Sequence, residues 1–305
     1  MLELRRLRLL HELHQRGTIA AVADALRFTP SAVSQQLAQL EREAGVPLLE
    51  RSGRSVRLTD AALVLAGHAA ALLERAAVAE AELAAAAGTV AGRARIAGFE
   101  SVLLRIALPA LDALAERAPA LRCEVVEAEP EPALPALAAG DLDLVLGDEW
   151  PHQPHRLPPG VTRIDLLPDP VRVIVPAGHP AGDPVALREL AGAAWATGHP
   201  AMGWEEMTQR TCRERGGFEP DIRHRVDDAT VALALVARGR AVTLLPALVA
   251  PEAVPGVEAR AIAGAPVART IFAATRASDA ARPSTRAVLE AVRYAARGIG
   301  ASGVV

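Results

Sequence analysis

The sequence predicts an α/β multidomain protein with a small helical N-terminal domain, a long linker helix and a C-terminal α/β domain of two lobes. Three observations support this prediction. Apolar residues recur at helical intervals through the first 45 residues, an alanine-rich stretch follows to residue 88, and short apolar runs alternate with helical patterns from Arg93 onward. A chain of 305 residues is long enough for two or three folded units.

The first 45 residues predict three helices. Leucines at helical spacing across residues 2–16 end at Gly17, a residue that suits the left-handed end of a helix. Thr18 can cap a short second helix. The third helix opens at Thr29-Pro30, because a hydroxyl cap followed by proline is a common start signal, and it continues to Gly45.

A hairpin and a long helix follow. Ser52-Gly53 is a turn signal between two short segments in which Val56 and Leu58 alternate with charged neighbours, so a small β-hairpin is expected. Thr59-Asp60 then opens the linker helix, which is expected to run to about Ala87 and to be about 40 Å long. A long helix with a narrow apolar stripe usually buries that stripe against a partner, and the alternative is a connector that lies on its own chain.

The remaining sequence predicts alternating strands and helices. The expected strands are Ala94–Ala97, Leu121–Val126, Leu142–Leu146, Thr162–Leu166, Val171–Val175, Ile222–Val226, Ala241–Leu244 and Thr270–Ala274. The expected helices are Val102–Arg117, Leu134–Ala139, Met202–Arg215, Ala229–Arg238 and Pro283–Arg297.

The chain is expected to pass between the two lobes at Trp150–Pro159 and again at Ala263–Pro266, where proline and small residues gather. The last strand and helix would then return to the first lobe and form a hinged clamshell. The predicted domains are residues 1–59, the linker helix 60–88 and the α/β domain 89–305, with lobe I at about 93–160 and 269–305 and lobe II at about 161–268.

Composition excludes several classes of protein. The formal net charge is -3, from 33 basic residues, all of them arginine, and 36 acidic residues, so the chain has no overall basic surface for nucleic acid. Cys123 and Cys212 lie far apart and indicate reduced cysteines rather than a disulfide framework or a paired metal motif. No window reaches the roughly 20 uncharged apolar residues of a membrane span, and the N-terminus lacks the apolar core of a signal peptide. A cytoplasmic protein without membrane contact is therefore expected.

One face of the third helix carries small hydrogen-bonding side chains. If Val33, Leu37 and Leu40 are buried, helical spacing puts these residues on the opposite face: Ser31, Ser34, Gln35, Ala38 and Arg42. Serine and glutamine can bond base edges or phosphates, and small residues in the first turn let a helix approach DNA closely. The N-terminus of the helix adds a positive dipole toward phosphate. A polar face that is merely solvated is the alternative.

The predicted hairpin is the most positive short segment of the chain. Arg51, Arg54 and Arg57 have only Glu50 nearby as an opposing charge, so they are expected to contact the phosphate backbone. Residues 1–60 carry a net charge of +2 and the remainder carries -5. A modestly basic N-terminal region is thus joined to an acidic remainder, and affinity for DNA must depend on where the arginines lie and on having more than one such region per assembly.

The order of these features resembles one family closely. Residues 29–59, TPSAVSQQLAQLEREAGVPLLERSGRSVRLT, resemble the signature of LysR-type transcriptional regulators almost position for position, and residues 1–88 resemble their winged helix-turn-helix and linker helix. Leu49 stands where that family usually has phenylalanine, and Ala62 stands where it usually has glycine, which affects local packing rather than DNA contact. The segments RARIAGFESVLLRIALPALDAL, ALAAGDLDLVLG, DPVRVIVPAGHPA and GRAVTLLP resemble, more loosely, the two-lobed effector domain of the family, which is similar to periplasmic binding proteins.

The resemblance implies a sequence-specific DNA-binding transcriptional regulator whose activity is modulated by a small-molecule effector bound between the lobes. It implies a homodimer or homotetramer on an inverted repeat in double-stranded promoter DNA, with RNA polymerase as a further expected partner. The expected DNA-binding residues are Thr29, Pro30, Ser31, Ser34, Gln35, Arg51, Arg54 and Arg57. Of these, Ser31, Ser34 and Gln35 are expected to read base edges.

Loops at the carboxyl ends of strands are where open α/β sheets place ligands, and the resemblance implies an effector there. The expected effector-binding residues are Phe99, Glu100, Ser101, Asp148, Glu149, Thr197, Gly198, His199, Asp227, Asp228 and Thr230. Asp227 and Asp228 can alternatively be simple helix caps. Because these loops contain five carboxylates and no arginine, we hypothesise an effector with a cationic or amino group rather than a simple dicarboxylate.

No metal, cofactor or catalytic activity is expected. Four histidines, His152, His155, His179 and His199, lie in loops without the spacing of a metal site, and Cys123 occupies an ordinary strand position rather than that of a cysteine switch. The chain has no nucleophile elbow, phosphate loop or zinc-protease motif. Two alternatives stay open: a cytosolic solute-binding or enzymatic α/β protein with a helical appendage, and a constitutive DNA binder without an effector.

Overall fold

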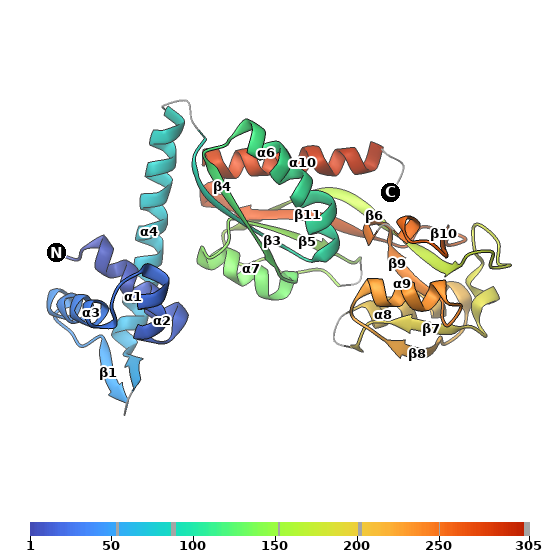
Figure 1. The fold of residues 1–305 in the computed structure, drawn as a ribbon, viewed down its shortest axis with the longest axis horizontal. Helices are drawn as coiled ribbons and strands as arrows, with labels where there is room; N and C mark the ends of the chain where they lie inside the picture. Colours follow the sequence, from blue (N-terminus) through green and yellow to red (C-terminus); the bar gives the residue numbers. More distant parts are fainter. Residues whose placement is uncertain (53–54, 87–89, 152, 201–202, 250, 302–305) are drawn as a thin grey trace.

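The computed structural model describes the chain except for residues 53–54, 87–89, 152, 201–202, 250 and 302–305. A helical head formed by residues 1–59 is followed by the rod of helix α4 and then by two α/β lobes (Figure 1). The architecture is the one that the sequence predicts. None of the helices in the described ranges is long and apolar enough to cross a membrane.

The head contains three helices and a hairpin. The helices are α1 (Leu4–Arg16), α2 (Ile19–Leu26) and α3 (Pro30–Ala44), and the hairpin strands are β1 (Leu49–Ser52) and β2 (Ser55–Leu58). Helices α1 and α3 end as predicted, at Gly17 and Gly45, whose φ angles of 74° and 70° favour glycine. Leu10, Val22 and Leu40 are fully buried in the core that these elements share.

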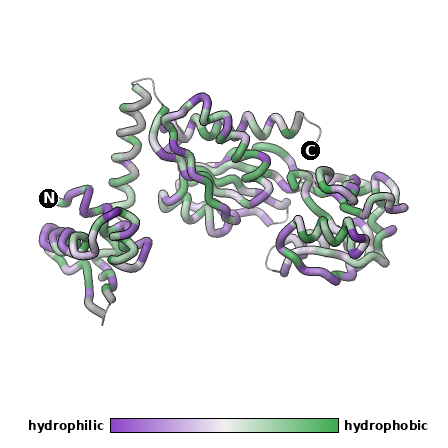
Figure 2. The backbone as a smooth tube through the Cα atoms, viewed as in Figure 1, coloured by the Kyte–Doolittle hydropathy of each residue, from purple (hydrophilic) through white to green (hydrophobic). Residues whose placement is uncertain are grey.

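Helix α4 (Asp60–Ala86) begins in the head and leaves it. The Thr59 hydroxyl joins the two, because it donates to the Pro47 carbonyl at 2.9 Å and accepts from the Ala62 amide at 3.1 Å. Ala62 and Ala66 are buried against the head, whereas Leu72 is 50% exposed. Figure 2 shows that apolar residues continue along the part of α4 that lies beyond the head.

Lobe I is built on a mixed sheet covered by helices on both faces (Figure 1). Its strands are β3 (Gly92–Gly98), β4 (Leu121–Glu127), β5 (Leu144–Glu149), the first half of β6 (Val161–Pro176) and β11 (Ala268–Arg276). Its helical segments are α5 (Glu100–Val102), the π-helical turn η1 (Leu103–Ala107), α6 (Leu108–Arg117), α7 (Pro130–Ala139), η7 (Ala277–Asp279) and α10 (Pro283–Ala301).

The two faces of the lobe I sheet follow the two-residue period of its strands. Along β5, Leu144 and Leu146 pack with α6 and α10, whereas Val145 packs with α7. Strand β11 alternates in the same way. Strands β3, β4 and β5 are parallel, so their carboxyl ends lie at one edge of the sheet.

Lobe II continues from the second half of β6. Its other strands are β7 (Ala194–Thr197), β8 (Asp221–Arg225), β9 (Thr243–Pro246) and β10 (Val257–Ala261). Its helical segments are η2 (Leu187–Leu190), α8 (Trp204–Thr211), the π-helical turn η4 (Cys212–Gly216), α9 (Ala229–Ala237), η5 (Ala247–Val249) and η6 (Pro251–Ala253). Strands β9 and β10 both pair with β6, and β7 pairs with β8.

The structure corrects the predicted path between the lobes. The two strands expected at Thr162–Leu166 and Val171–Val175 are one strand, β6, which pairs with β11 up to Pro170 and with β9 from Val171. The first crossing therefore lies inside β6 rather than in Trp150–Pro159. Pro168 and Pro170 lie inside this strand, because a proline can occupy a strand where its missing amide is not needed.

Other boundaries also differ from the predictions. Helix α7 begins at Pro130, four residues before the expected Leu134, because proline suits the first turn of a helix. Helix α8 begins at Trp204, and the expected start at Met202 lies outside the described residues. Strands β7 and β10 were not expected from the sequence.

Candidate functional site

Helix α3 presents a polar face to solvent. Val33, Leu37 and Leu40 are at most 1% exposed, so they fix which way the helix turns. Ser34 and Gln35 lie on the exposed side, as the helical spacing predicts. The helix thus offers hydrogen-bonding side chains that no core contact requires.

The first turn of α3 is held by its own hydroxyl groups. The Thr29 Oγ1 accepts from the Ala32 amide at 3.2 Å and lies 3.0 Å from the Ser31 Oγ. Pro30 is the first helical residue, where its missing amide removes no helical hydrogen bond. Both hydroxyl groups are exposed and keep capacity for a further partner.

Polar contacts fix α3 against the rest of the head. The Arg6 guanidinium of α1 donates to the Gln36 side chain at 3.0 Å and to the Glu43 carboxylate. The Glu41 Oε1 accepts from the amides of Leu48 and Leu49, at 2.8 and 3.0 Å, and so sets where the hairpin starts. No local pattern in the sequence indicates these roles, because the partners are far apart along the chain.

The hairpin lies beyond the end of α3. Its strands pair antiparallel from Leu49 with Leu58 to Ser52 with Ser55. Arg57 is exposed and lies opposite Glu50 in the register. Arg54 and the side chain of Arg51 lie outside the described residues, so of the three hairpin arginines only Arg57 can be placed.

A cavity of about 260 Å³ opens between the two lobes. Lobe I contributes Phe99, Ser101, Glu129, Glu131, Asp148 and Arg269, and lobe II contributes Trp204, Met207, Asp227, Ala229, Leu245 and Pro246. The segment between β5 and β6 adds Trp150, Gln153 and His155. The carboxyl ends of β3 and β5 meet this cavity, which is where open α/β sheets bind ligands.

Arg269 of β11 forms the floor of the cavity. Its Nε donates to the Asp169 Oδ2 at 2.8 Å, its Nη1 to the Asp148 Oδ2 at 3.1 Å and its Nη2 to the Ser101 Oγ at 3.3 Å. Its guanidinium carbon lies 4.8 Å from the centre of the Phe99 ring. Burial raises the pKa of the Asp169 carboxyl, and the Arg269 charge beside it opposes that rise.

The structure brings four of the predicted effector residues to the cavity wall: Phe99, Ser101, Asp148 and Asp227. Other predicted residues have different contacts. The Glu149 carboxylate pairs with Arg163 at 2.7 Å and accepts from the His155 amide at 3.0 Å. These contacts lower the pKa of Glu149, chiefly through the hydrogen bond from Arg163. Glu100 is exposed beside the cavity rather than among its lining residues.

Of the predicted residues of lobe II, Asp227 lines the cavity and the others have different contacts. Thr197 is fully buried, with its Oγ1 3.4 Å from the Thr208 Oγ1. The Asp227 Oδ1 accepts from the His199 amide at 2.9 Å, and the two hydrogen bonds from His199 lower the pKa of Asp227. The Asp228 carboxylate caps α9 by accepting from the Thr230 amide at 2.7 Å, which is the alternative role that the sequence left open.

Gly198 supports a tryptophan of the cavity. A Cβ atom at this position would lie 3.2 Å from the Trp204 Cε3. The Trp204 Nε1 donates to the Leu244 carbonyl at 2.9 Å. The missing Cβ of Gly198 thus leaves room for the indole, and the hydrogen bond to Leu244 holds it in place at the cavity wall.

Several lining residues were not found from the sequence. Arg269 enters from a strand, so the inspected loops gave no sign of an arginine at the cavity. Glu129 precedes α7 and Trp150 follows β5, and both positions follow strands that the sequence did predict. Glu129 lies three residues past Val126 and Trp150 lies four residues past Leu146, so a window of four residues after each predicted strand includes both. In the described part of the chain, no group of three His, Cys, Asp or Glu side chains could hold a metal ion.

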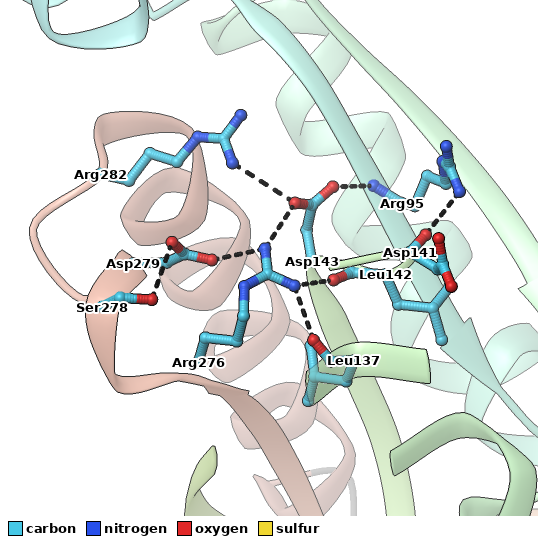
Figure 3. Close-up of polar contacts among 9 residues, drawn as sticks. All are labelled: Arg95, Leu137, Asp141, Leu142, Asp143, Arg276, Ser278, Asp279 and Arg282. Carbon is cyan, nitrogen blue, oxygen red and sulfur yellow. Dashed lines mark hydrogen bonds and ion pairs between the residues drawn. The ribbon is translucent and has the colours of Figure 1, made fainter. Parts of the chain in front are cut away.

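A second charged cluster lies at the opposite end of the lobe I sheet (Figure 3). The Asp143 carboxylate accepts from the Arg95 amide at 2.8 Å, from the Arg276 Nη2 at 3.2 Å and from the Arg282 Nη1 at 3.4 Å. Arg276 also pairs with Asp279 at 2.6 Å. The cluster joins the start of β5, the end of β11 and the start of α10, and its charges neutralise one another, so we assign it a structural role.

Comparison with known proteins matches both the head and the α/β domain of the chain to family models. Residues 4–63 match the model of the bacterial regulatory helix-turn-helix protein, lysR family, and residues 87–297 match the LysR substrate binding domain. The chain is 29% identical to the HTH-type transcriptional regulator TfdS of Cupriavidus pinatubonensis over 96% of this chain and 98% of that protein. It is 34% identical to the HTH-type transcriptional regulator ShiR of Corynebacterium glutamicum over 73% of this chain and 79% of that protein.

A solved structure is similar over the whole chain. Full-length CbnR complexed with its target DNA is 26% identical, with a TM-score of 0.55, and the match covers 97% of this chain and 100% of that one. CbnR is described as a LysR family transcriptional regulator.

Proposed function

This chain belongs to the LysR family of transcriptional regulators, and from that premise we propose that it binds a promoter inverted repeat as a dimer or a dimer of dimers. The exposed face of α3 is the observation that carries the proposal. Ser31, Ser34 and Gln35 read base edges, while Thr29, the first turn at Pro30 and the hairpin arginines Arg51, Arg54 and Arg57 contact phosphate. The similarity to full-length CbnR, whose structure was solved with its target DNA, supports DNA binding by a chain of this architecture.

Sequence readout is tested by replacing a glutamine on each of two faces of α3. DNA sequences bound by the full chain are first selected from a random pool. Gln35→Ala should then lower the preference for the selected DNA over scrambled DNA, because each bidentate base contact contributes about 1–3 kcal/mol of discrimination. Gln36→Ala is the matched control, since Gln36 lies off that face and bonds Arg6. Equal preference in the two variants would remove α3 from base readout.

Phosphate contact by the hairpin is tested through salt dependence. Arg57→Ala should weaken binding to all DNA and reduce the slope of log affinity against log salt by about 1, because one fewer counterion is released. Arg57→Lys keeps the charge and should keep the slope. An unchanged slope in Arg57→Ala would place this arginine away from the phosphates.

The dimer is proposed to form along α4. Val64, Leu72 and Leu83 are 64%, 50% and 73% exposed, and helical geometry brings them to one side of the helix. Single chains rarely leave such a stripe in water. Leu72→Glu should therefore dissociate the dimer in sedimentation experiments, whereas Leu63→Glu, on another side of α4, should not. A Leu72→Glu dimer of unchanged stability would exclude this interface.

The cavity between the lobes is proposed to bind a small-molecule effector that changes DNA binding or transcription. Its size and its mixture of aromatic and charged walls support a ligand-responsive regulator over the constitutive alternative. We assign the chain no catalytic activity, a cytoplasmic location and RNA polymerase as a partner at the promoter. The proposed parts are the head at residues 1–59, the linker at 60–88 and the effector domain at 89–305.

A further inference from the structure

We propose that the ligand of the cavity is an organic cation, an ammonium group attached to an apolar body. This inference rests on the proposed function of the cavity as the effector site. It extends the sequence-based hypothesis of an amino effector, and it depends on residues that the sequence did not reveal. Three features of the cavity support it: its charge, the engagement of its arginine and its aromatic walls.

The described lining residues carry an excess of negative charge. Glu129, Glu131, Asp148 and Asp227 contribute carboxylates, and Arg269 is the one guanidinium among them. Within the described ranges, the Glu129 carboxylate has no hydrogen bond or ion pair. A cation that enters the cavity therefore meets a carboxylate whose charge is not already compensated.

Arg269 is not available to an anion. Asp169, itself 0% exposed, and Asp148 neutralise it, and it also stacks on Phe99. A carboxylate ligand would have to displace Asp148 and bring a further negative charge beside Asp169. Since an unpaired buried charge is costly, this exchange is unfavourable.

Aromatic side chains gather at the cavity although the chain has few of them. Three of the eight aromatic residues, Phe99, Trp150 and Trp204, line it. Arg269 already occupies one face of Phe99. Trp204 lies in the wall of the same cavity, and tryptophan attracts cations within about 6 Å of its ring more strongly than the other aromatic residues do. An ammonium group with an apolar body fits these walls better than an inorganic cation.

The pKa of Glu129 is raised above its ordinary value, which makes its charge sensitive to a cation beside it. The side chain keeps contact with solvent, but the walls of the cavity partly desolvate it, and this loss of solvation is the main cause of the raised pKa. The negative charges of Asp148 and Glu131 raise the pKa further, and Glu127 adds weakly. The positive charge of Arg269 opposes the rise. A bound cation would favour the ionised form. Affinity for a cation should therefore increase as the pH rises through this raised pKa.

The test uses pairs of probes that share a body and differ in charge. Benzylammonium is compared with benzoate, and butane-1,4-diammonium with adipate, each titrated into the full chain and followed by calorimetry and by the melting temperature. The ammonium members should bind and raise the melting temperature, and added salt should weaken them. Binding of the carboxylates instead, or of neither class, would overturn the proposal.

Two variants locate the site. Glu129→Gln should weaken benzylammonium about 10-fold, as expected when a hydrogen bond to a charged group is lost, and it should leave the free protein equally stable because Glu129 pairs with nothing in the described ranges. Glu116→Gln, exposed on α6 outside the cavity, is the control. Equal affinity in both variants would mean that the cation does not bind at Glu129.

DNA binding separates this inference from the proposed function. If a carboxylate binds and changes affinity for the selected DNA, the effector function stands and the cation inference fails. If an ammonium probe binds at Glu129 but neither DNA affinity nor transcription responds, the cation preference stands and the effector function fails.

Discussion

Asp143→Asn should destabilise the α/β domain more than its conservative size suggests. The Asp143 side chain is 17% exposed and its two guanidinium partners, Arg276 and Arg282, are 8% and 9% exposed. The asparagine side chain has the shape of the aspartate side chain, but it carries no charge. Its NH2 group would also face the Arg95 amide or a guanidinium, which are themselves hydrogen-bond donors. Breaking a buried ion pair costs about 3–5 kcal/mol. Because Asp279 still neutralises Arg276, we expect the lower end, about 3 kcal/mol.

The expected shift can be measured by tryptophan fluorescence during heating. All three tryptophans, Trp150, Trp195 and Trp204, lie in the α/β domain, so their emission reports that domain and not the head. For a domain of this size, about 3 kcal/mol corresponds to a melting temperature lower by roughly 6–12 °C.

Asp141→Asn is the matched control for this measurement. Asp141 enters the network through its carbonyl oxygen, to which Arg95 donates at 2.6 Å, so the change should cost less than about 0.5 kcal/mol (Figure 3). Equal melting temperatures for Asp143→Asn and the unmodified protein would refute the assignment of a structural role to the cluster.

Three further predictions concern the same domain. The pKa of Glu149 in the folded protein is lowered from its ordinary value of 4.5. The ionised carboxylate therefore contributes its full stability above pH 4.5, and this contribution is lost as the pH falls through the lowered pKa of the folded state. Glu149→Gln lacks this contribution, so its melting temperature should decrease less on acidification than that of the unmodified protein. Burial raises the pKa of both thiols, and that of Cys212 to about 12; because Cys123 is partly exposed and Cys212 is buried, a thiolate-specific reagent should label Cys123 slowly in the native protein and Cys212 only after unfolding. Gly147→Ala should destabilise lobe I by about 1–3 kcal/mol in chemical denaturation, because the new Cβ would lie 2.5 Å from the buried Phe272 ring.

The head was predictable because its signals are local. Because α3 has about 3.6 residues per turn and buries Val33 and Leu37, Ser34 and Gln35 must lie on its exposed face. Glycine and proline mark where the helices of the head begin and end. Each of these signals spans fewer than about five residues of sequence. The exposed face therefore follows from the sequence before any contact between helices is known.

The cavity floor was not predictable in the same way. Arg269 meets Asp169 and Ser101, which are 100 and 168 residues away in the chain, and no local pattern indicates either contact. The sequence predicts this strand as Thr270–Ala274, which leaves Arg269 just outside it, and the register of β11 with β6 decides what the arginine faces. Register depends on pairing between distant segments, and here it also includes a shift between Ile271 and Phe272.

The position of Asp169 relates the cavity to the crossing between the lobes. It lies in β6 where that strand passes from lobe I to lobe II, and its two carboxylate oxygens meet different parts: Oδ2 accepts from Arg269, and Oδ1 accepts from the Leu248 amide at 2.9 Å. Arg269 in turn pairs with Asp148 at the cavity wall. One set of ion pairs thus belongs both to the ligand cavity and to the crossing between the lobes.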